Sequence, residues 1–274
     1  MTGPAGSIRG KDDFIRRIAV RLGRGEPLKE APPRDVKGVP EFYRAAAASR
    51  QELIDRFVRE WTALSGKVRL VPRGEAAAGA AAYLEEIVTG EKVEAVSLWD
   101  DPEIAGLGLE AALNRLGAET VVWRESNGGL SGDGGDNGHD PDDGPKAEDG
   151  TDGGKPSGWR ARSGLLRATE RCRLGVVCPD YAIANTGTLV LQACGGRGRS
   201  VSLLPSVLLA VFPAERLVMR MGEALERLRS EGETKGGLPS SITLVTGPSR
   251  SADIENDLTI GVHGPGKVHA LILV

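Results

Sequence analysis

Hydrophobic residues recur with helical spacing near the start of the chain and again around residue 57. The segment "KDDFIRRIAVRLGR", residues 11–24, carries charges on one side of a predicted helix and apolar residues on the other. A second helix is predicted where Leu53, Phe57 and Trp61 repeat every fourth residue before Gly66. The proline-rich residues 26–40 between the two predict an extended segment. The apolar face of the first helix consists of Phe14, Ile15, Ile18 and Leu22.

Strand-like and helix-like patterns then alternate between residues 67 and 123. The short apolar runs "KVRLVP", "VEAVSLW" and "ETVVW" predict strands, and residues 75–88 and 102–116 between them predict helices. This order is typical of a parallel sheet whose strands are joined by right-handed crossovers.

Further apolar runs rich in β-branched residues follow from residue 173 and predict more strands. The runs are "RLGVVCPDYAIANTGTLVL", "RSVSLLPSVLLAVFP", "SSITLVTG" and "KVHALILV", with helices predicted at 160–171 and 217–229. We therefore predict an α/β fold, a parallel-rich open sheet flanked by helices. Residues 1–45 would form an N-terminal helical arm with an extended segment, and residues 46–274 one α/β domain.

A Gly- and Asp-rich tract at residues 127–158 interrupts this rhythm. It holds eight acidic residues against two lysines, and too few apolar residues to offset the entropy of ordering the chain. We predict a flexible insert. A calcium loop is the alternative, but the acidic residues do not follow the EF-hand spacing.

Composition and cysteine spacing argue against several classes of protein. The net charge of −3 gives no argument for nucleic-acid binding. No apolar run reaches the roughly 18 residues of a transmembrane helix, and the N-terminus lacks a secretory signal, so we expect a cytoplasmic protein without a membrane span. Cys172, Cys178 and Cys194 fit neither zinc nor ferredoxin spacing, which predicts free thiols and no metal in this chain. Nicotinamide, zinc-protease and triad-hydrolase motifs are also missing.

The stretch "ANTGTLVL" is the first candidate ligand-binding loop. Asn185, Thr186, Gly187 and Thr188 place an amide and two hydroxyls around a glycine, and such groups can cradle a carboxylate or a phosphate. The structural alternative is a hairpin turn that needs glycine at positive φ.

The stretch "TGPSRSADIENDLTIGVHGPG", residues 246–266, is the second candidate. After a predicted strand, Gly247 and Pro248 turn the chain, and Ser249 or Ser251 can cap a helix beginning near Ala252. A strand that runs into a helix N-terminus forms an anion site, to which Arg250 would add a bidentate donor.

Two acidic residues in this stretch leave its interpretation open. Asp253 and Glu255 would occupy the first helical turn, so the stretch can equally be a well-capped helix with Arg250 on its surface. A third interpretation pairs Arg250 with one of these carboxylates and aims the carboxylate at a ligand. On either ligand-binding interpretation, residues 246–266 would form the rim of a pocket at the carboxyl end of a strand in the open sheet.

Further candidates lie in two glycine-rich turns. In "GVHGPG", His263 precedes Gly264 and could donate to a substrate oxygen or move a proton near neutral pH, although a lone histidine is more often structural. In "GGRGRS", Arg197 and Arg199 could close over an anion, or the turn could be a plain surface loop.

At these loops the sequence resembles the LUD domain family. "AIANTGTLVL", "SLLPSVLLAVFP" and "TGPSRSADIENDLTIGVHGP" are similar to its successive signature motifs, and within the family the chain looks most like the lactate utilization protein C subgroup. The resemblance is loose over residues 10–125 and close over 165–274. It assigns no catalytic role to any residue. The insert at 127–158 looks longer than is usual in the family.

The resemblance implies a fold similar to sugar-phosphate isomerases and coenzyme A transferases. It also implies a subunit of a system that oxidises L-lactate to pyruvate. Iron–sulfur clusters are then expected in the partner lactate utilization subunits, with no cofactor in this chain, which would bind a small anionic metabolite. Two alternatives stay open: a stand-alone enzyme and a metabolite-sensing module, either acting on a small phosphorylated or coenzyme A-type acyl ligand.

Overall fold

The computed structural model of the chain describes residues 10–28, 30, 48–124, 158–235, 237, 239, 241–251 and 259–274. The chain divides into two compact units, Met1–Ala46 and Ala47–Val274. In the first unit, helix α1 (Lys11–Arg21) exposes the apolar face predicted from the sequence, with Phe14 and Leu22 more than half exposed. The predicted flexible insert lies outside the described residues except for Gly158, where helix α7 begins.

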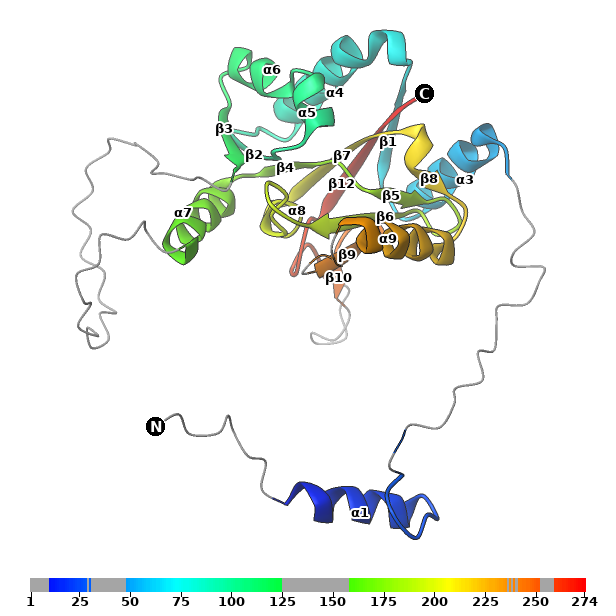
Figure 1. Ribbon diagram of the computed structural model, residues 1–274. Helices are drawn as coiled ribbons and strands as arrows, with labels where there is room; N and C mark the ends of the chain where they lie inside the picture. Colours follow the sequence, from blue (N-terminus) through cyan, green and yellow to red (C-terminus); the bar gives the residue numbers. More distant parts are fainter. Residues whose placement is uncertain are drawn as a thin grey trace, which may run out of the picture. The chain divides into compact units, whose positions relative to one another are not determined.

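A six-stranded parallel sheet forms the centre of the second unit (Figure 1). Every neighbouring pair in it runs parallel, which confirms the α/β prediction. Its strands, in sheet order, are β1 (Lys67–Val71), β12 (Lys267–Leu273), β7 (Val207–Pro213), β4 (Leu174–Val177), β2 (Ala95–Trp99) and β3 (Glu119–Trp123).

Helices cover both faces of this sheet because the crossovers run in both directions along it. The chain moves from β1 to β2 and β3 through helices on the upper face in Figure 1, and returns through β4, β7 and β12 on the other. The upper helices are α4 (Ala76–Gly90), α5 (Pro102–Gly106) and α6 (Leu109–Arg115), and the lower ones include α7 (Gly158–Arg171) and α8 (Ser200–Leu203).

A second, four-stranded sheet is built by the connections that leave β4 and β7. Its order is β8 (Leu217–Val218), β5 (Tyr181–Ile183), β6 (Thr188–Ala193) and β9 (Ser241–Val245). Helix α9 (Met221–Lys235) begins later than predicted because Leu217 and Val218 pair with β5 as a strand. Residues Arg250–Ser251 (β10) and Thr259–Ile260 (β11) form a separate antiparallel ribbon.

The core is mostly aliphatic, with one aromatic cluster that anchors helix α3 (Arg50–Ala63). Phe57 stacks on Trp61 at 5.5 Å between ring centroids and meets Phe212 of β7 edge to face at 5.7 Å. The indole of Trp61 donates a hydrogen bond to the Lys67 carbonyl at 3.1 Å. A side chain at Gly66 would overlap the Trp61 ring, so glycine is required there.

Within the described part of the chain, no helix combines the length and the apolar character that a membrane span requires.

A buried histidine lies on the central strand β12. His269 Nδ1 is 2.9 Å from the Tyr83 hydroxyl of α4, and its Nε2 has no hydrogen-bond partner among the described residues. Burial, together with the nearby Lys67 charge, lowers the pKa of His269 to about 4. The imidazole is therefore neutral in the folded protein at neutral pH.

This histidine makes the stability depend on pH. Because the pKa is about 4 in the folded chain and near 6.5 when unfolded, the unfolded state binds the proton first, and stability falls as the pH drops from 6.5 toward 4. The expected loss is on the order of 3 kcal/mol. In urea unfolding at pH 7 and pH 4.5, His269→Gln should remove most of this difference, and an undiminished pH dependence in that variant would contradict it.

Candidate functional site

The first predicted loop forms the turn of the β5–β6 hairpin. Gly187 has φ of 57°, and a Cβ there would lie 2.8 Å from the Trp61 backbone nitrogen of α3. The Asn185 N–H donates to the Met219 carbonyl at 3.1 Å. The hairpin alternative therefore accounts for the glycine, through both its backbone conformation and its close approach to a helix.

A chain of hydroxyl groups joins the two predicted loops. Thr186 Oγ1 lies 2.8 Å from Thr188 Oγ1, which lies 2.8 Å from Thr246 Oγ1. Thr188 is buried, and these two neighbours satisfy the hydrogen-bonding capacity of its hydroxyl group. Two stretches that are about 60 residues apart in sequence are thus side by side.

The second loop packs on the C-terminus of α3. Gly247 has φ of 78°, and a Cβ there would lie 2.9 Å from the Leu64 Cβ. The Arg250 guanidinium donates to the Leu64 carbonyl at 3.0 Å, a carbonyl that follows the last helical turn. Arg250 therefore stabilises a helix end with one of its five N–H donors.

Arg250 and Ser251, within the predicted strand-to-helix anion site, pair with Ile260 and Thr259 as an antiparallel ribbon. The strand that precedes the loop, β9, belongs to the second sheet and pairs antiparallel with β6, which corrects the predicted place in the parallel sheet. The predicted helix from Ala252, with Asp253 and Glu255, lies outside the described residues.

The remaining predicted residues of this stretch lie around the base of the ribbon. The Ser249 N–H donates to the Pro265 carbonyl at 2.8 Å, and Gly264 lies directly beside the Ser249 side chain. His263 is exposed, and the apolar side chains of Ile260 and Val262 are also exposed, by 56% and 45%.

A different constellation lies at the carboxyl edge of the parallel sheet. The chain continues from β2 to β3 on one side and from β4 to β7 on the other, so the direction of the connections reverses between β2 and β4. In open parallel sheets, ligands usually bind at the carboxyl edge beside such a switch point. Asp100 and Asp101 follow β2, and Asp180 follows β4 after Cys178 and Pro179. Our sequence reasoning missed these acids, although an acidic residue directly after a buried strand was a usable signal.

Arg197 occupies this switch point. Its guanidinium forms ion pairs with Asp101 and, at 2.7 Å, with Asp180, so it joins the segments that follow β2 and β4. Burial alone would lower the pKa of Arg197, but the carboxylates of Asp180 and Asp101 outweigh it and raise that pKa. The crevice is therefore filled by the chain's own side chain, which pairs with both carboxylates and does not act as a free anion clamp.

The glycines of the turn "GGRGRS", residues 195–200, allow this turn to approach the sheet edge closely. The Trp99 indole donates to the Gly198 carbonyl at 2.9 Å, and a Cβ at Gly198 would overlap the Trp123 ring. Arg199, the residue predicted to bind a ligand, lies beyond the crevice as an exposed residue at the start of α8.

The cysteines offer no reactive thiolate in the interior. Cys178, beside the switch point, is fully buried, and burial raises the pKa of its thiol. Burial likewise raises the pKa of Cys172 to about 11, and Cys194 is exposed. Among the residues that the structure describes, no group of three or more His, Cys, Asp or Glu side chains could hold a metal ion.

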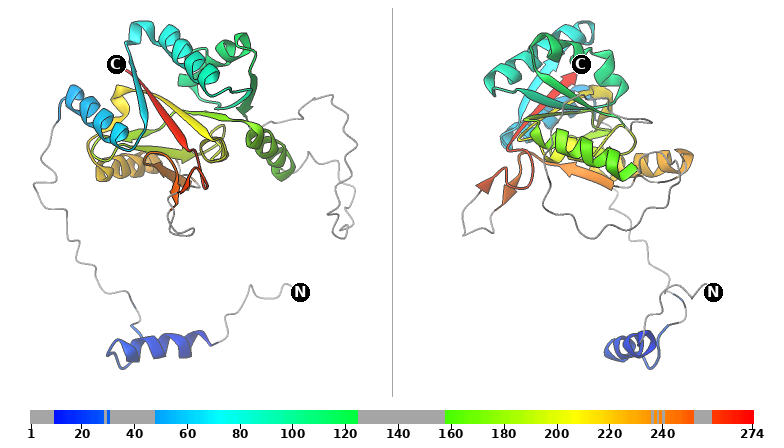
Figure 2. Two further views of the ribbon diagram at one scale, coloured as in Figure 1. Left: turned by 180° about the vertical axis from the view of Figure 1, so that it is seen from behind. Right: turned by 90° about the vertical axis from the view of Figure 1, so that its left-hand side faces the viewer.

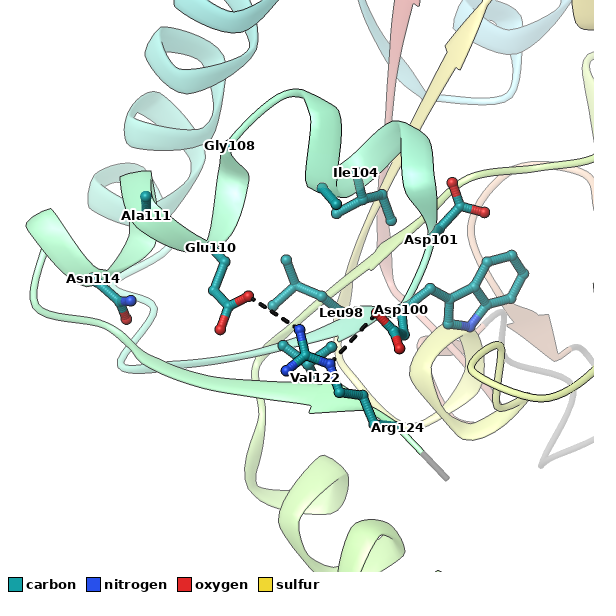
Figure 3. A pocket seen from close by; sticks show the side chains of 12 residues that line it. Leu98, Asp100, Asp101, Ile104, Gly108, Glu110, Ala111, Asn114, Val122 and Arg124 are labelled. Carbon is teal, nitrogen blue, oxygen red and sulfur yellow. Dashed lines mark ion pairs between the residues drawn. The ribbon is translucent and has the colours of Figure 1, made fainter. Parts of the chain in front are cut away.

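An open pocket of about 330 Å³ adjoins the filled crevice, at the carboxyl ends of β2 and β3 (Figure 3). Its apolar side chains include Leu98, Ile104 and Val122, and Arg124 lies between two carboxylates at its rim. Arg124 Nε is 3.5 Å from Asp100 and Nη2 is 3.6 Å from Glu110 of α6. Both distances exceed those of a normal N–H···O hydrogen bond, so the three charged groups keep capacity for a ligand.

Comparison with known proteins finds a family and several relatives. The model of the LUD domain matches residues 54–273. Lactate utilization protein C of Macrococcus caseolyticus is 42% identical over 268 residues, which cover 98% of this chain and 97% of that protein. Lactate utilization protein C of Halalkalibacterium halodurans is 29% identical, covering 94% and 95%. A crystal structure of a DUF162 family protein from Deinococcus radiodurans matches at 16% identity and a TM-score of 0.49, covering 83% of this chain and 99% of that one.

The Arg197 pairs predict a large effect on stability. Arg197→Ala leaves the fully buried carboxylate of Asp101 without its counter-charge, and we expect a loss of about 3 kcal/mol in the free energy of unfolding. Arg199→Ala, an exposed arginine two residues away, is the control and should change it by less than about 0.5 kcal/mol. Equal effects of the two substitutions in denaturant unfolding would show that the ion pairs do not stabilise the crevice.

Proposed function

This chain belongs to the LUD domain family, and we propose that it is the component of a lactate utilization system that works with iron–sulfur partner subunits to oxidise L-lactate to pyruvate. The observation that carries the proposal is the similarity along nearly the whole chain to proteins named lactate utilization protein C. The family model begins at residue 54, whereas these alignments also extend into the N-terminal arm.

The proposed reaction needs an electron carrier. Oxidation of lactate to pyruvate removes two electrons and two protons from the hydroxyl-bearing carbon and its oxygen. The described residues hold no group of side chains suited to a metal centre, and burial keeps the thiols of Cys172 and Cys178 protonated. We therefore assign the iron–sulfur clusters to the partner subunits and the contacts with them to this chain.

The base of the β10–β11 ribbon is the surface that best suits such a contact. We call Arg250, Ile260, Val262 and His263 the ribbon surface. It combines two exposed aliphatic side chains with an exposed arginine, and protein interfaces are enriched in arginine around an apolar centre. The partner would bury Ile260 and Val262 and surround the Arg250 guanidinium.

The same surface is the proposed place for a small anionic metabolite such as lactate. Arg250 donates one N–H to the Leu64 carbonyl, and a guanidinium carries further N–H donors of the kind that bind a carboxylate. Ser249 and Gly264 lie beside one another at the base of the ribbon, and His263 is exposed. Asp253 and Glu255 remain predicted contributors from the adjoining segment.

Arg250→Ala should weaken the assembled system without unfolding the chain. We expect at least about a tenfold loss of co-isolated iron and of lactate-dependent dye reduction, as for an interface hot spot. The melting temperature should change little, because Arg250 is exposed and its hydrogen bond within the described residues goes to the Leu64 carbonyl. The measurement is made on the tagged full-length chain isolated from its native cells without oxygen.

Arg115→Ala is the matched control, because Arg115 is an exposed arginine on α6, which lies on the other face of the parallel sheet from the second sheet. It should retain wild-type iron and activity. Wild-type values in Arg250→Ala would refute the role of the ribbon surface. A wild-type chain that brings down neither iron nor activity would refute the role in an iron–sulfur system.

A further inference from the structure

We propose that the pocket at the carboxyl ends of β2 and β3 binds an uncharged nucleoside, with the ribose hydroxyls on Asp100 and Glu110 and the base over the aliphatic floor. This site is separate from the ribbon surface: its residues lie in the segment Leu98–Arg124 and share none with that surface. The nucleoside proposal can therefore be tested independently of the proposed role in lactate utilization.

The charges at the rim argue for a neutral ligand. Two carboxylates flank one guanidinium, so the rim carries an excess negative charge that disfavours a phosphate or a carboxylate. A cation that approaches the two acids also meets the positive charge of Arg124, which lies between them. Asp101 adds no charge to the rim, since its carboxylate is paired with Arg197 and points away from Arg124 in Figure 3.

The hydrogen-bonding capacity of the rim selects a ligand with adjacent hydroxyl groups. An ionised carboxylate only accepts hydrogen bonds, so Asp100 and Glu110 call for O–H or N–H donors. Their distances of 3.5 and 3.6 Å to Arg124 show that neither is held in a short hydrogen bond with it. A vicinal diol can donate to both, and Asn114 adds an amide elsewhere in the pocket lining.

The floor and the size of the pocket suit a heterocyclic base attached to that diol. Ala105, Ala111 and Val122 provide the accessible apolar surface above the buried Leu98 and Ile104. The exposed Arg124 guanidinium can stack on a planar ring. The volume of about 330 Å³ is at the low end for ligand pockets, which typically span roughly 300–1,000 Å³. Such a pocket admits a nucleoside and is too small for a dinucleotide.

The position in the fold explains why this space is open. Ligands favour the carboxyl edge beside the switch point of an open parallel sheet. Between β2 and β4 that edge is filled by Arg197 and the glycine-rich loop around it. On the β3 side of β2 the described residues that line this edge come from β2, α5, α6 and β3 with Arg124, and the pocket lies there.

Calorimetric titration of the full-length chain with adenosine, 2′-deoxyadenosine and adenosine monophosphate tests the assignment. Adenosine should bind, and 2′-deoxyadenosine should bind about tenfold more weakly because one hydroxyl donor to a carboxylate is lost. The monophosphate should bind more weakly than adenosine because of the negative rim. Binding of adenosine should change little with salt, since the ligand is uncharged.

Two variants place the ligand in the pocket. Glu110→Gln should weaken adenosine binding about tenfold by removing a charged acceptor. Ala111→Phe, at an exposed position of α6, should abolish binding by filling the pocket while leaving the melting temperature unchanged. Glu119→Gln is the matched control, because Glu119 lies at the opposite end of β3 and should leave binding at the wild-type level.

Three results would overturn the assignment: no binding of adenosine up to its solubility limit, tighter binding of the monophosphate than of adenosine, or wild-type affinity in Ala111→Phe. None of these results bears on the iron and dye-reduction measurements that test the ribbon surface.

Discussion

The insertion of β12 between β1 and β7 is the constraint on which the rest of this structure depends. The strand formed by the last residues of the chain pairs with β1 on one side and with β7 on the other, as the red strand in Figure 2 shows. Its end is fixed as well, because the Val274 N–H donates to Val71 and the Val274 carbonyl accepts from Arg73. Among the strands that the structure describes, β1 therefore joins the sheet through β12 alone.

This long-range closure also positions the loops that carry the candidate chemistry. The stretch from Thr246 to Gly266 connects the end of β9 to the beginning of β12, so it is held at both ends by strands of two different sheets. The C-terminus of α3 supplies a third anchor, through Gly187, Gly247 and Arg250. The glycines of the two loops and the buried Thr188 thus have structural roles, whereas Arg250 and His263 lie at the surface.

At the carboxyl edge of the parallel sheet, two arginines each lie between two carboxylates, one in a filled crevice and one beside an open pocket. Arg197 pairs with both Asp101 and Asp180 in the crevice, and these ion pairs offset the cost of burying the charges. One strand further along, Arg124 is shared loosely between two carboxylates above an apolar floor. The same residue types therefore form a filled structural pair in one place and an open, ligand-sized space in the next, because the distances and the burial differ.

The sequence by itself determined the elements whose cause is local. Apolar runs bounded by turn residues predicted the parallel strands, the four-residue repeat of Leu53, Phe57 and Trp61 predicted α3, and the glycine in "NTGT" suggested a hairpin turn as one of its two interpretations. Tertiary structure alone decided that Arg250 and Ser251 form a ribbon, that Thr188 meets Thr246, and that Arg197 meets Asp101 and Asp180. Those contacts join residues from about ten to about a hundred positions apart. A local periodicity does not specify which distant partner a polar side chain contacts, because the spatial order of the strands in the sheets decides that.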